Sequence, residues 1–274
     1  MNLLKDGLVM GESPRWHDGR LWLSDWGTGE ILALDDAGGA EVMARVPALP
    51  FCFDFLPDGR LLVVSGREGL LLRHERDGSV VTHADLTSLA PPPWNDIVVD
   101  GNGNAYVGCT GFDFPGGEFA PGLVACVTPG GLVREVADGV AFPNGVAIAP
   151  DGATLVLAES YGKCLTGWDI DPGGGLSGRR VWADLHGWGV PDGICFDAEG
   201  AVWYADVPNQ RCVRVAEGGK VLQTVPADRG CFACMLGDDD GRTLYVVANR
   251  YDNGQVGDGI VLTERVDVPH AGMP

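Results

Sequence analysis

A tight turn containing a glycine, followed by a short apolar strand, recurs six times along this chain. The steps from one turn glycine to the next are 40, 44, 49, 48 and 41 residues, so the repeats cover most of the 274 residues. Repeats in the forties with strands on both sides of the turn are typical of a β-propeller, in which each repeat forms one four-stranded blade. We therefore expect an all-β fold in which residues 1–274 form a single six-bladed β-propeller domain. The six turns are Asp18-Gly19, Asp58-Gly59, Asn102-Gly103, Asp151-Gly152, Glu199-Gly200 and Asp240-Gly241.

The composition agrees with a turn-rich protein and narrows the range of partners. Glycine accounts for 42 residues, roughly twice its usual share of about 7%. The formal net charge of −19 argues against nucleic acid or an anionic membrane surface, because both attract clustered Lys and Arg. No apolar run approaches the ~18 residues that span a bilayer, and residues 1–6 lack the apolar stretch of a secretion signal. We expect a cytoplasmic protein with a small-molecule substrate and no nucleic-acid or membrane partner.

The last repeat supplies three clear strands, so the ring needs a fourth strand from elsewhere. Residues 232–236, 243–247 and 260–263 are apolar and strand-like. Residues 264–266 offer one candidate for the fourth strand, and residues 3–10, which precede the first repeat, offer another. We predict that residues 3–10 dock as the outer strand of the last blade, because closing the ring removes exposed sheet edges.

In a propeller the innermost strand of every blade begins near the central channel, so residues far apart in the sequence meet there. This position lies seven or eight residues before each turn glycine. Two of the six positions fall at Phe51 or Cys52 and at Ala233 or Cys234. The other four carry a side-chain oxygen, and they are Glu12, Asn95, Asn144 and Asp192.

Two carboxylates and two amides form the ligand set that a hard divalent cation such as Ca²⁺, Mg²⁺ or Mn²⁺ prefers. Two carboxylates also balance a 2+ charge, which makes a partly desolvated site tolerable. Asn-Gly and Asp-Gly are ordinary turn dipeptides, so any one of these positions alone carries little weight. Agreement between four equivalent positions favours a central metal site that holds one divalent cation.

The segments around these positions are Gly11-Glu12-Ser13-Pro14-Arg15-Trp16, Asn95-Asp96, Pro143-Asn144-Gly145 and Pro191-Asp192-Gly193. At this spacing they resemble the hallmark segments of the regucalcin/gluconolactonase (senescence marker protein-like) family, and the resemblance spans the full chain. It implies a six-bladed propeller that binds one divalent metal, Ca²⁺ with Mn²⁺, Zn²⁺ or Mg²⁺ as alternatives, and that hydrolyses a lactone. It also implies that Glu12, Asn144 and Asp192 are the metal ligands. Asn95 corresponds to a residue that contacts the substrate, or the metal through water.

Two features depart from the sugar-lactone members of that family. Where those members have an arginine two residues before the channel asparagine, this chain has Pro93, followed by Trp94. An arginine offers several donors to a polyhydroxylated ligand, whereas Pro-Trp offers an apolar wall. Asp113 falls where such members place a substrate-contacting glutamate, but it lies in a largely apolar segment beside Phe112. We predict that Asn95, Trp94, Phe112 and Asp113 bind the substrate, and the departures favour a more hydrophobic lactone or ester.

Together these features predict a divalent-metal-dependent lactone hydrolase. Asp192 is the expected catalytic residue, because a carboxylate at the ion can also reach a bound water. Whether Asp192 acts as general base or as nucleophile stays open. One alternative is a phosphotriester or fluorophosphate hydrolase, since the same ion can polarise a P=O bond. A non-enzymatic calcium-binding propeller is another, because fold alone does not determine function.

Overall fold

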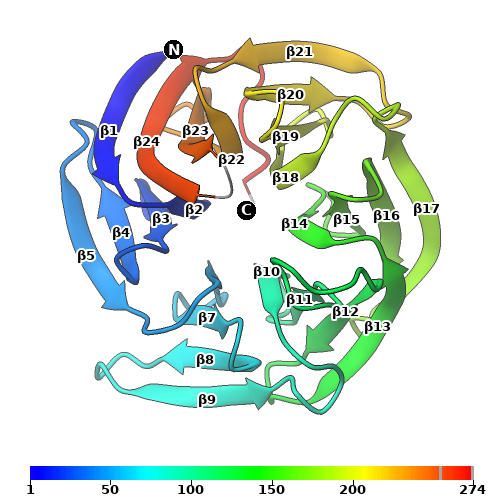
Figure 1. Cartoon of the computed structure of the whole chain (residues 1–274). Coiled ribbons are helices and arrows are strands. Elements are labelled where there is room, and N and C mark those ends of the chain that lie inside the picture. Colours follow the sequence, from blue (N-terminus) through cyan, green and yellow to red (C-terminus); the bar gives the residue numbers. More distant parts are fainter. Residues whose placement is uncertain (253–254, 273–274) are drawn as a thin grey trace.

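The computed structural model describes residues 1–252 and 255–272, and every regular element within them is a β-strand. The strands form six four-stranded sheets arranged as a ring (Figure 1). The predicted all-β, six-bladed β-propeller is therefore confirmed. No segment of the described chain forms a helix that could cross a membrane.

The first strand of each blade lies at the centre of the ring, next to the first strands of the neighbouring blades (Figure 1). These innermost strands are β2 (Gly11–His17), β6 (Phe51–Phe55), β10 (Trp94–Val99), β14 (Pro143–Ile148), β18 (Pro191–Phe196) and β22 (Gly230–Gly237). The second strands are β3 (Arg20–Asp25), β7 (Leu61–Ser65), β11 (Ala105–Cys109), β15 (Thr154–Glu159), β19 (Val202–Asp206) and β23 (Thr243–Asp252).

The outer half of each blade is more exposed. The third strands are β4 (Glu30–Leu34), β8 (Leu70–His74), β12 (Gly122–Val127), β16 (Cys164–Ile170), β20 (Arg211–Val215) and β24 (Gln255–Arg265). The outermost strands are β5 (Ala40–Arg45), β9 (Val80–Asp85), β13 (Val133–Val140), β17 (Leu176–Asp184), β21 (Val221–Pro226) and β1 (Asn2–Leu8). Much of the hydrophobic core lies between adjacent blades, as where Leu62 and Val64 of β7 share a cluster with Trp94 and Ile97 of β10.

The repeated glycine turn joins the first and second strands of every blade. All six turn glycines have φ between 69° and 82°, a conformation that a residue without Cβ adopts at little cost. The period found in the sequence is therefore the period of these inner hairpins, which explains why it locates the start of each innermost strand.

The last blade is closed by the N-terminal strand. β1 pairs antiparallel with β24, so the sheet order is β1-β24-β23-β22. This confirms the predicted closure, although the strand spans Asn2–Leu8 and not residues 3–10. Residues 264 and 265 belong to β24 and form no separate strand.

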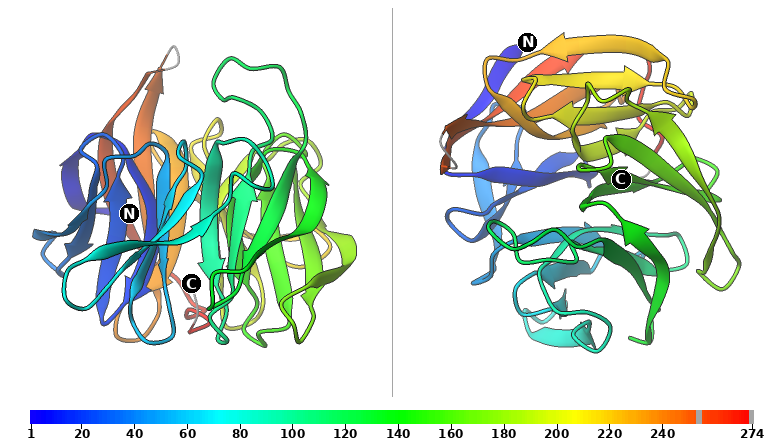
Figure 2. Two further views of the ribbon diagram at one scale, coloured as in Figure 1. Left: turned by 90° about the horizontal axis from the view of Figure 1, so that it is seen from below. Right: turned by 45° about the vertical axis from the view of Figure 1, so that its right-hand side comes forward.

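The turns between second and third strands lie on one face of the ring, which we call the mouth face. Most of them are short. The connection 110–121, between β11 and β12, is longer and rises above the ring, and the long strands β23 and β24 extend beyond the ring on the same side (Figure 2). They frame the opening of the cavity described next.

Candidate active site

A cavity of about 700 Å³ opens at the mouth face and extends to the centre of the ring. Every blade contributes a residue from its innermost strand to the lining of this cavity. These residues are Glu12 of β2, Cys52 of β6, Asn95 of β10, Asn144 of β14, Asp192 of β18 and Cys234 of β22. The structure therefore brings the four predicted oxygen donors to one place, which we call the floor of the cavity.

The floor residues lie where the innermost strands depart from regular pairing. Each of the four strands that carries an oxygen donor has a shift in register at that residue, whereas β6 pairs regularly with β7 along its whole length. Such bulges turn a side chain out of the normal alternation and are common beside active sites. The shifts fall between Glu12 and Arg15, Trp94 and Ile97, Pro143 and Val146, and Pro191 and Ile194.

Two glycines let the floor strands approach one another. A Cβ atom added at Gly145 would lie 2.5 Å from the Asp192 carbonyl oxygen, and one at Gly193 would lie 2.6 Å from the Ala233 Cβ. The pairs Asn144-Gly145 and Asp192-Gly193 therefore lie within strands and are not turns. They place a polar side chain beside a point where neighbouring blades nearly touch.

Hydrogen bonds orient the amide groups of the floor. Asn95 Nδ2 donates to Asn144 Oδ1 at 3.4 Å, and Asn144 Nδ2 donates to Ser160 Oγ at 3.2 Å. Ser160 Oγ in turn donates to the Pro191 carbonyl oxygen at 2.7 Å. Ser160, which follows β15, is a site residue that sequence reasoning missed. It links the strands that carry Asn144 and Asp192.

The two carboxyl groups of the floor are held in an environment that disfavours their charge. Burial raises the pKa of Glu12 above its ordinary value, and the Asp96 carboxylate raises it further. Burial likewise raises the pKa of Asp192 well above its ordinary value, and repulsion from Glu12 and Asp96 adds to this effect. A cation placed between these groups would relieve both the desolvation and the repulsion.

A buried ion-pair network supports the floor, and sequence reasoning missed it too. Arg15 Nη2 donates to Asp96 Oδ1 at 3.1 Å and to the Ile97 carbonyl oxygen at 2.6 Å, and Arg15 Nε lies 3.7 Å from Asp54 Oδ1. Arg15 and Asp96 lie within the hallmark segments, so their position in the sequence was the available signal. Asp54 and Asp96 thus flank a single guanidinium, and the same positive charge partly opposes the rise in the pKa of Glu12.

The donor chemistry of the floor fits a hard divalent cation. Two carboxylates, two amide oxygens and an excess of negative charge meet at one end of the cavity, which is what such an ion requires. Among the described residues, no three His, Cys, Asp or Glu side chains form a metal-binding group. The floor is not such a group, because two of its four donors are asparagine amides.

The substrate-binding residues predicted beyond Asn95 lie away from the floor. Phe112 packs behind the cavity, with its ring centroid 5.7 Å from that of Phe142 and 5.9 Å from that of Tyr161. Asp113 is exposed at the mouth and pairs with Arg67, whose Nη1 lies 3.2 Å from Asp113 Oδ1. Neither Phe112 nor Asp113 is among the described residues that line the cavity, whereas Arg67 is.

Trp94 lies in the core. Its side chain is fully buried in the cluster between the second and third blades, and it is not among the described residues that line the cavity. Trp94 lies at the register shift of β10 and packs with Leu62 and Val64 of the neighbouring blade, whereas Asn95 reaches the cavity.

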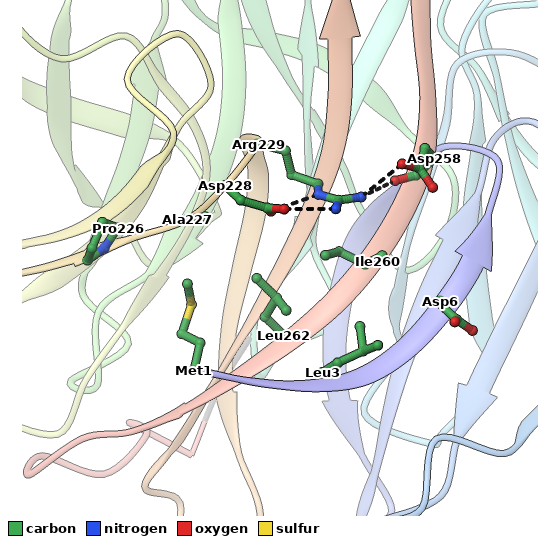
Figure 3. Close-up of a pocket in the computed structure, with 10 residues that line it drawn as sticks. All are labelled: Met1, Leu3, Asp6, Pro226, Ala227, Asp228, Arg229, Asp258, Ile260 and Leu262. Carbon is green, nitrogen blue, oxygen red and sulfur yellow. Dashed lines mark hydrogen bonds and ion pairs between the residues drawn. The ribbon is translucent and has the colours of Figure 1, made fainter.

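A separate pocket of about 520 Å³ lies on the outside of the last blade, between β1, β24 and the segment that follows β21 (Figure 3). Three of its charged side chains are paired with one another, with Arg229 Nε 2.9 Å from Asp228 Oδ1 and Arg229 Nη1 3.3 Å from Asp258 Oδ2. None of the predicted site residues lines it.

Known proteins are similar to this chain in sequence and in fold. A 6-deoxy-6-sulfogluconolactonase from Pseudomonas putida is 26% identical over 279 residues, covering 97% of this chain and 94% of the relative. A pentonolactonase from Haloferax volcanii is 25% identical over 291 residues, covering 97% and 93%. The crystal structure of a calcium-binding protein, regucalcin, from Agrobacterium tumefaciens superimposes with a TM-score of 0.76 over 100% of both chains at 20% identity, which is a likeness of fold.

The family assignment rests on a match that includes the whole floor. The model of the SMP-30/gluconolactonase/LRE-like region matches residues 10–250. This range contains Glu12, Asn95, Asn144 and Asp192. The chain therefore belongs to the SMP-30/gluconolactonase/LRE-like family.

Proposed function

We propose that this protein is a divalent-metal-dependent hydrolase of a small lactone. The observation that carries the proposal is the floor, where oxygen donors from four blades converge under a cavity of about 700 Å³. The names of two relatives that match nearly the whole chain, a sulfogluconolactonase and a pentonolactonase, support lactone chemistry. A cavity of this size is typical of small-molecule sites.

Glu12, Asn144 and Asp192 would hold the cation, for which we propose Ca²⁺ first and Mn²⁺, Zn²⁺ or Mg²⁺ as alternatives. The regucalcin of similar fold is described as calcium-binding, which supports this order. When bound, such an ion polarises the lactone carbonyl and stabilises negative charge on its oxygen. Ser160 would keep the Asn144 amide turned so that Oδ1 faces away from Ser160 and toward the cavity.

Asp192 would act on the water that attacks the lactone. In the general-base version, its carboxylate takes a proton from that water as the oxygen bonds to the carbonyl carbon. The ring C–O bond then breaks, and the proton passes to the leaving ring oxygen. In the nucleophilic version a carboxylate oxygen of Asp192 attacks the carbonyl carbon, and the ring C–O bond breaks as the ring oxygen takes a proton from water. Water then hydrolyses the resulting mixed anhydride, which releases the hydroxy acid and restores Asp192. Asn95 would hold the substrate in place through its side-chain amide in both versions.

Turnover of a panel of lactones and phosphotriesters, with and without chelator, tests this function. We expect hydrolysis of at least one lactone that is abolished by chelator and restored by a divalent cation. Hydrolysis of phosphotriesters but of no lactone would favour the alternative function, a phosphotriester or fluorophosphate hydrolase. Metal binding without turnover of any compound would point to a calcium-binding propeller.

A further inference from the structure

We propose that the substrate of this site is a lactone that carries an apolar ring substituent, which packs against a wall of aromatic side chains beside the floor. The inference rests on the proposed lactonase function and specifies its substrate class. The proposed substrate differs from the polyhydroxylated lactones that appear in the names of the relatives. The wall consists of Phe112, Phe114, Phe119, Phe142 and Tyr161, and we call it the aromatic wall.

The five rings form one contiguous cluster at the mouth face. Phe142 lies at its centre, with its ring centroid 4.9 Å from that of Phe114 and 4.8 Å from that of Tyr161. Phe112 contacts all the other members, and the Phe112–Phe119 centroid distance is 5.6 Å. Phe114, Phe142 and Tyr161 line the cavity, whereas Phe112 and Phe119 contact other members of the wall without being among the described lining residues.

The wall leaves apolar surface open to the cavity. The exposed fractions are 42% for Phe114 and 50% for Tyr161, so about half of each ring remains accessible although the rings lie in one cluster. Leu49 and Tyr251 also line the cavity and are 49% and 60% exposed. Contiguous apolar surface of this kind, rimmed by polar residues, marks a binding site for an apolar group.

Phe142 is held in the wall at a conformational cost. Its φ is 61°, which is rare for a bulky side chain. The amide N–H groups of Ser160 and Tyr161 donate to the carbonyl oxygens of Phe142 and Ala141, both at 3.1 Å, and keep this backbone in place. The Ala141 N–H donates to the buried Glu159 carboxylate at 2.7 Å. Such strain is maintained where the surrounding structure over-determines it, often at ligand sites.

The wall is directly connected to the floor. Phe142 precedes Asn144 by two residues, and Tyr161 follows Ser160, which hydrogen-bonds Asn144. A lactone whose carbonyl lies at the floor would therefore direct a ring substituent along the wall. Sugar hydroxyls in the same position would face aromatic carbon and lose their hydrogen bonds to water.

The guanidinium of Arg67, at the mouth near the wall, is already engaged by neighbouring groups. Arg67 lines the cavity, but its guanidinium is paired with Asp113 and donates to the Phe114 carbonyl oxygen at 3.4 Å. It ties the β7–β8 turn to the segment that carries Phe114. The guanidinium is thus engaged by the wall itself.

Steady-state kinetics on matched lactones tests the proposal. For wild-type protein with saturating metal, we expect kcat/KM for γ-phenyl-γ-butyrolactone to exceed that for D-glucono-1,5-lactone by about tenfold or more. Tyr161→Ala and Phe114→Ala should each lower kcat/KM for the phenyl compound about tenfold, mainly through KM. Both should leave unsubstituted γ-butyrolactone within about twofold. Trp188→Ala is the matched control, because Trp188 is 77% exposed and lies outside the cavity lining.

Binding of a lactam separates this inference from the proposed function. 5-Phenyl-2-pyrrolidinone has the same ring and substituent but resists hydrolysis, and its binding can be followed by calorimetry. Weaker binding to Tyr161→Ala than to wild type supports the wall even if no lactone is hydrolysed, in which case only the lactonase function fails. Metal-dependent turnover of gluconolactone without lactam binding, or equal losses on all lactones in the wall variants, would overturn the inference and leave the function standing.

Discussion

The floor and the aromatic wall of the cavity differ in how the chain builds them. The floor takes one residue from the same position in successive blades, and these residues lie on strands that the whole ring holds in place. The wall comes from two neighbouring blades only, mainly from the long connection 110–121 and the turn that follows β15. Scaffold strands can therefore preserve a reaction while turns change what is bound.

A second contrast lies within the floor itself. The four innermost strands with an oxygen donor are bulged at that residue, whereas β6, which presents Cys52, pairs regularly with β7. β22 has a register shift between Cys231 and Ala233 but offers no oxygen donor from its side chains there. A position of the floor needs both a bulge and an oxygen donor, because the bulge orients the side chain and the oxygen atom supplies the ligand chemistry.

The largest expected effect concerns a residue that belongs to neither region. Trp94→Ala should lower the free energy of unfolding by about 3–5 kcal/mol, because it removes a fully buried indole from the core. Any loss of activity should be equal for phenyl-substituted and unsubstituted lactones. Thermal and denaturant unfolding measure the free energy of unfolding, and steady-state kinetics measures the activity. The milder Trp94→Phe keeps the protein folded for the comparison, and a selective loss on the phenyl compound would place the indole at the ligand.

At the floor, Asp192→Asn should reduce turnover at least about 10²-fold, as removal of a general base does. Asparagine keeps an oxygen ligand of similar shape, so metal binding should persist in weakened form. Saturating metal should not restore turnover. The control is Asp113→Asn, since Asp113 is exposed and contacts Arg67 at the rim; we expect a change within about twofold. If a high metal concentration restored the turnover of Asp192→Asn, Asp192 would be only a metal ligand and not the base or nucleophile.

Glu12→Gln should weaken metal affinity at least about tenfold, as loss of supporting charge at a metal site typically does. Excess metal should restore most of the turnover, in contrast to Asp192→Asn. Titration with metal, followed by activity and by melting temperature, distinguishes the two variants. If metal affinity is unchanged in Glu12→Gln, Glu12 is not a ligand.

The raised pKa of Glu12 predicts that the stability of the metal-free protein depends on pH. Burial holds the folded-state pKa of Glu12 above its ordinary value of 4.5, so the folded state prefers the protonated carboxyl. The resulting destabilisation is absent below the ordinary pKa and grows as the pH rises toward the raised folded value. Melting temperature in chelator should therefore fall between pH 5 and pH 8 more steeply for wild type than for Glu12→Gln. Parallel curves would contradict this.

The smallest expected effect is at the link between floor and wall. Ser160→Ala removes the group that accepts from Asn144 and donates to the Pro191 carbonyl oxygen. Loss of such buried hydrogen bonds costs about 1–3 kcal/mol of stability. Turnover should drop a few-fold on all lactones, because the Asn144 amide is less well oriented. Ser160→Thr keeps the hydroxyl and should recover part of the loss, whereas an Ala variant with wild-type turnover would show that the link is dispensable.

Sequence reasoning brought the four floor residues together but assigned Trp94 to the substrate pocket, and the difference has a physical reason. The glycine turn sets a common origin in each blade, so Glu12, Asn95, Asn144 and Asp192 could be found by counting from it. Trp94 was assigned to the pocket by its closeness to Asn95 along the chain. The bulge at Asn95 turns the amide into the cavity, and the structure packs the indole of Trp94 between the blades.

The remaining parts of the site depend on contacts between distant segments. Arg15 reaches Asp96 and Asp54 across three blades, and no local pattern pairs them. Phe112 was expected to touch substrate, but its ring packs against Phe142 and Tyr161 and leaves the cavity lining to them.

The sequence by itself determined the number of blades, the closing strand and the four floor positions, because each follows from a period that local turn chemistry imposes. Only the tertiary structure decided which glycines let adjacent blades meet, how the buried charges are paired, and which aromatic rings face the cavity. These features arise where segments tens of residues apart pack together. Packing selects one of many arrangements that the same local pattern allows.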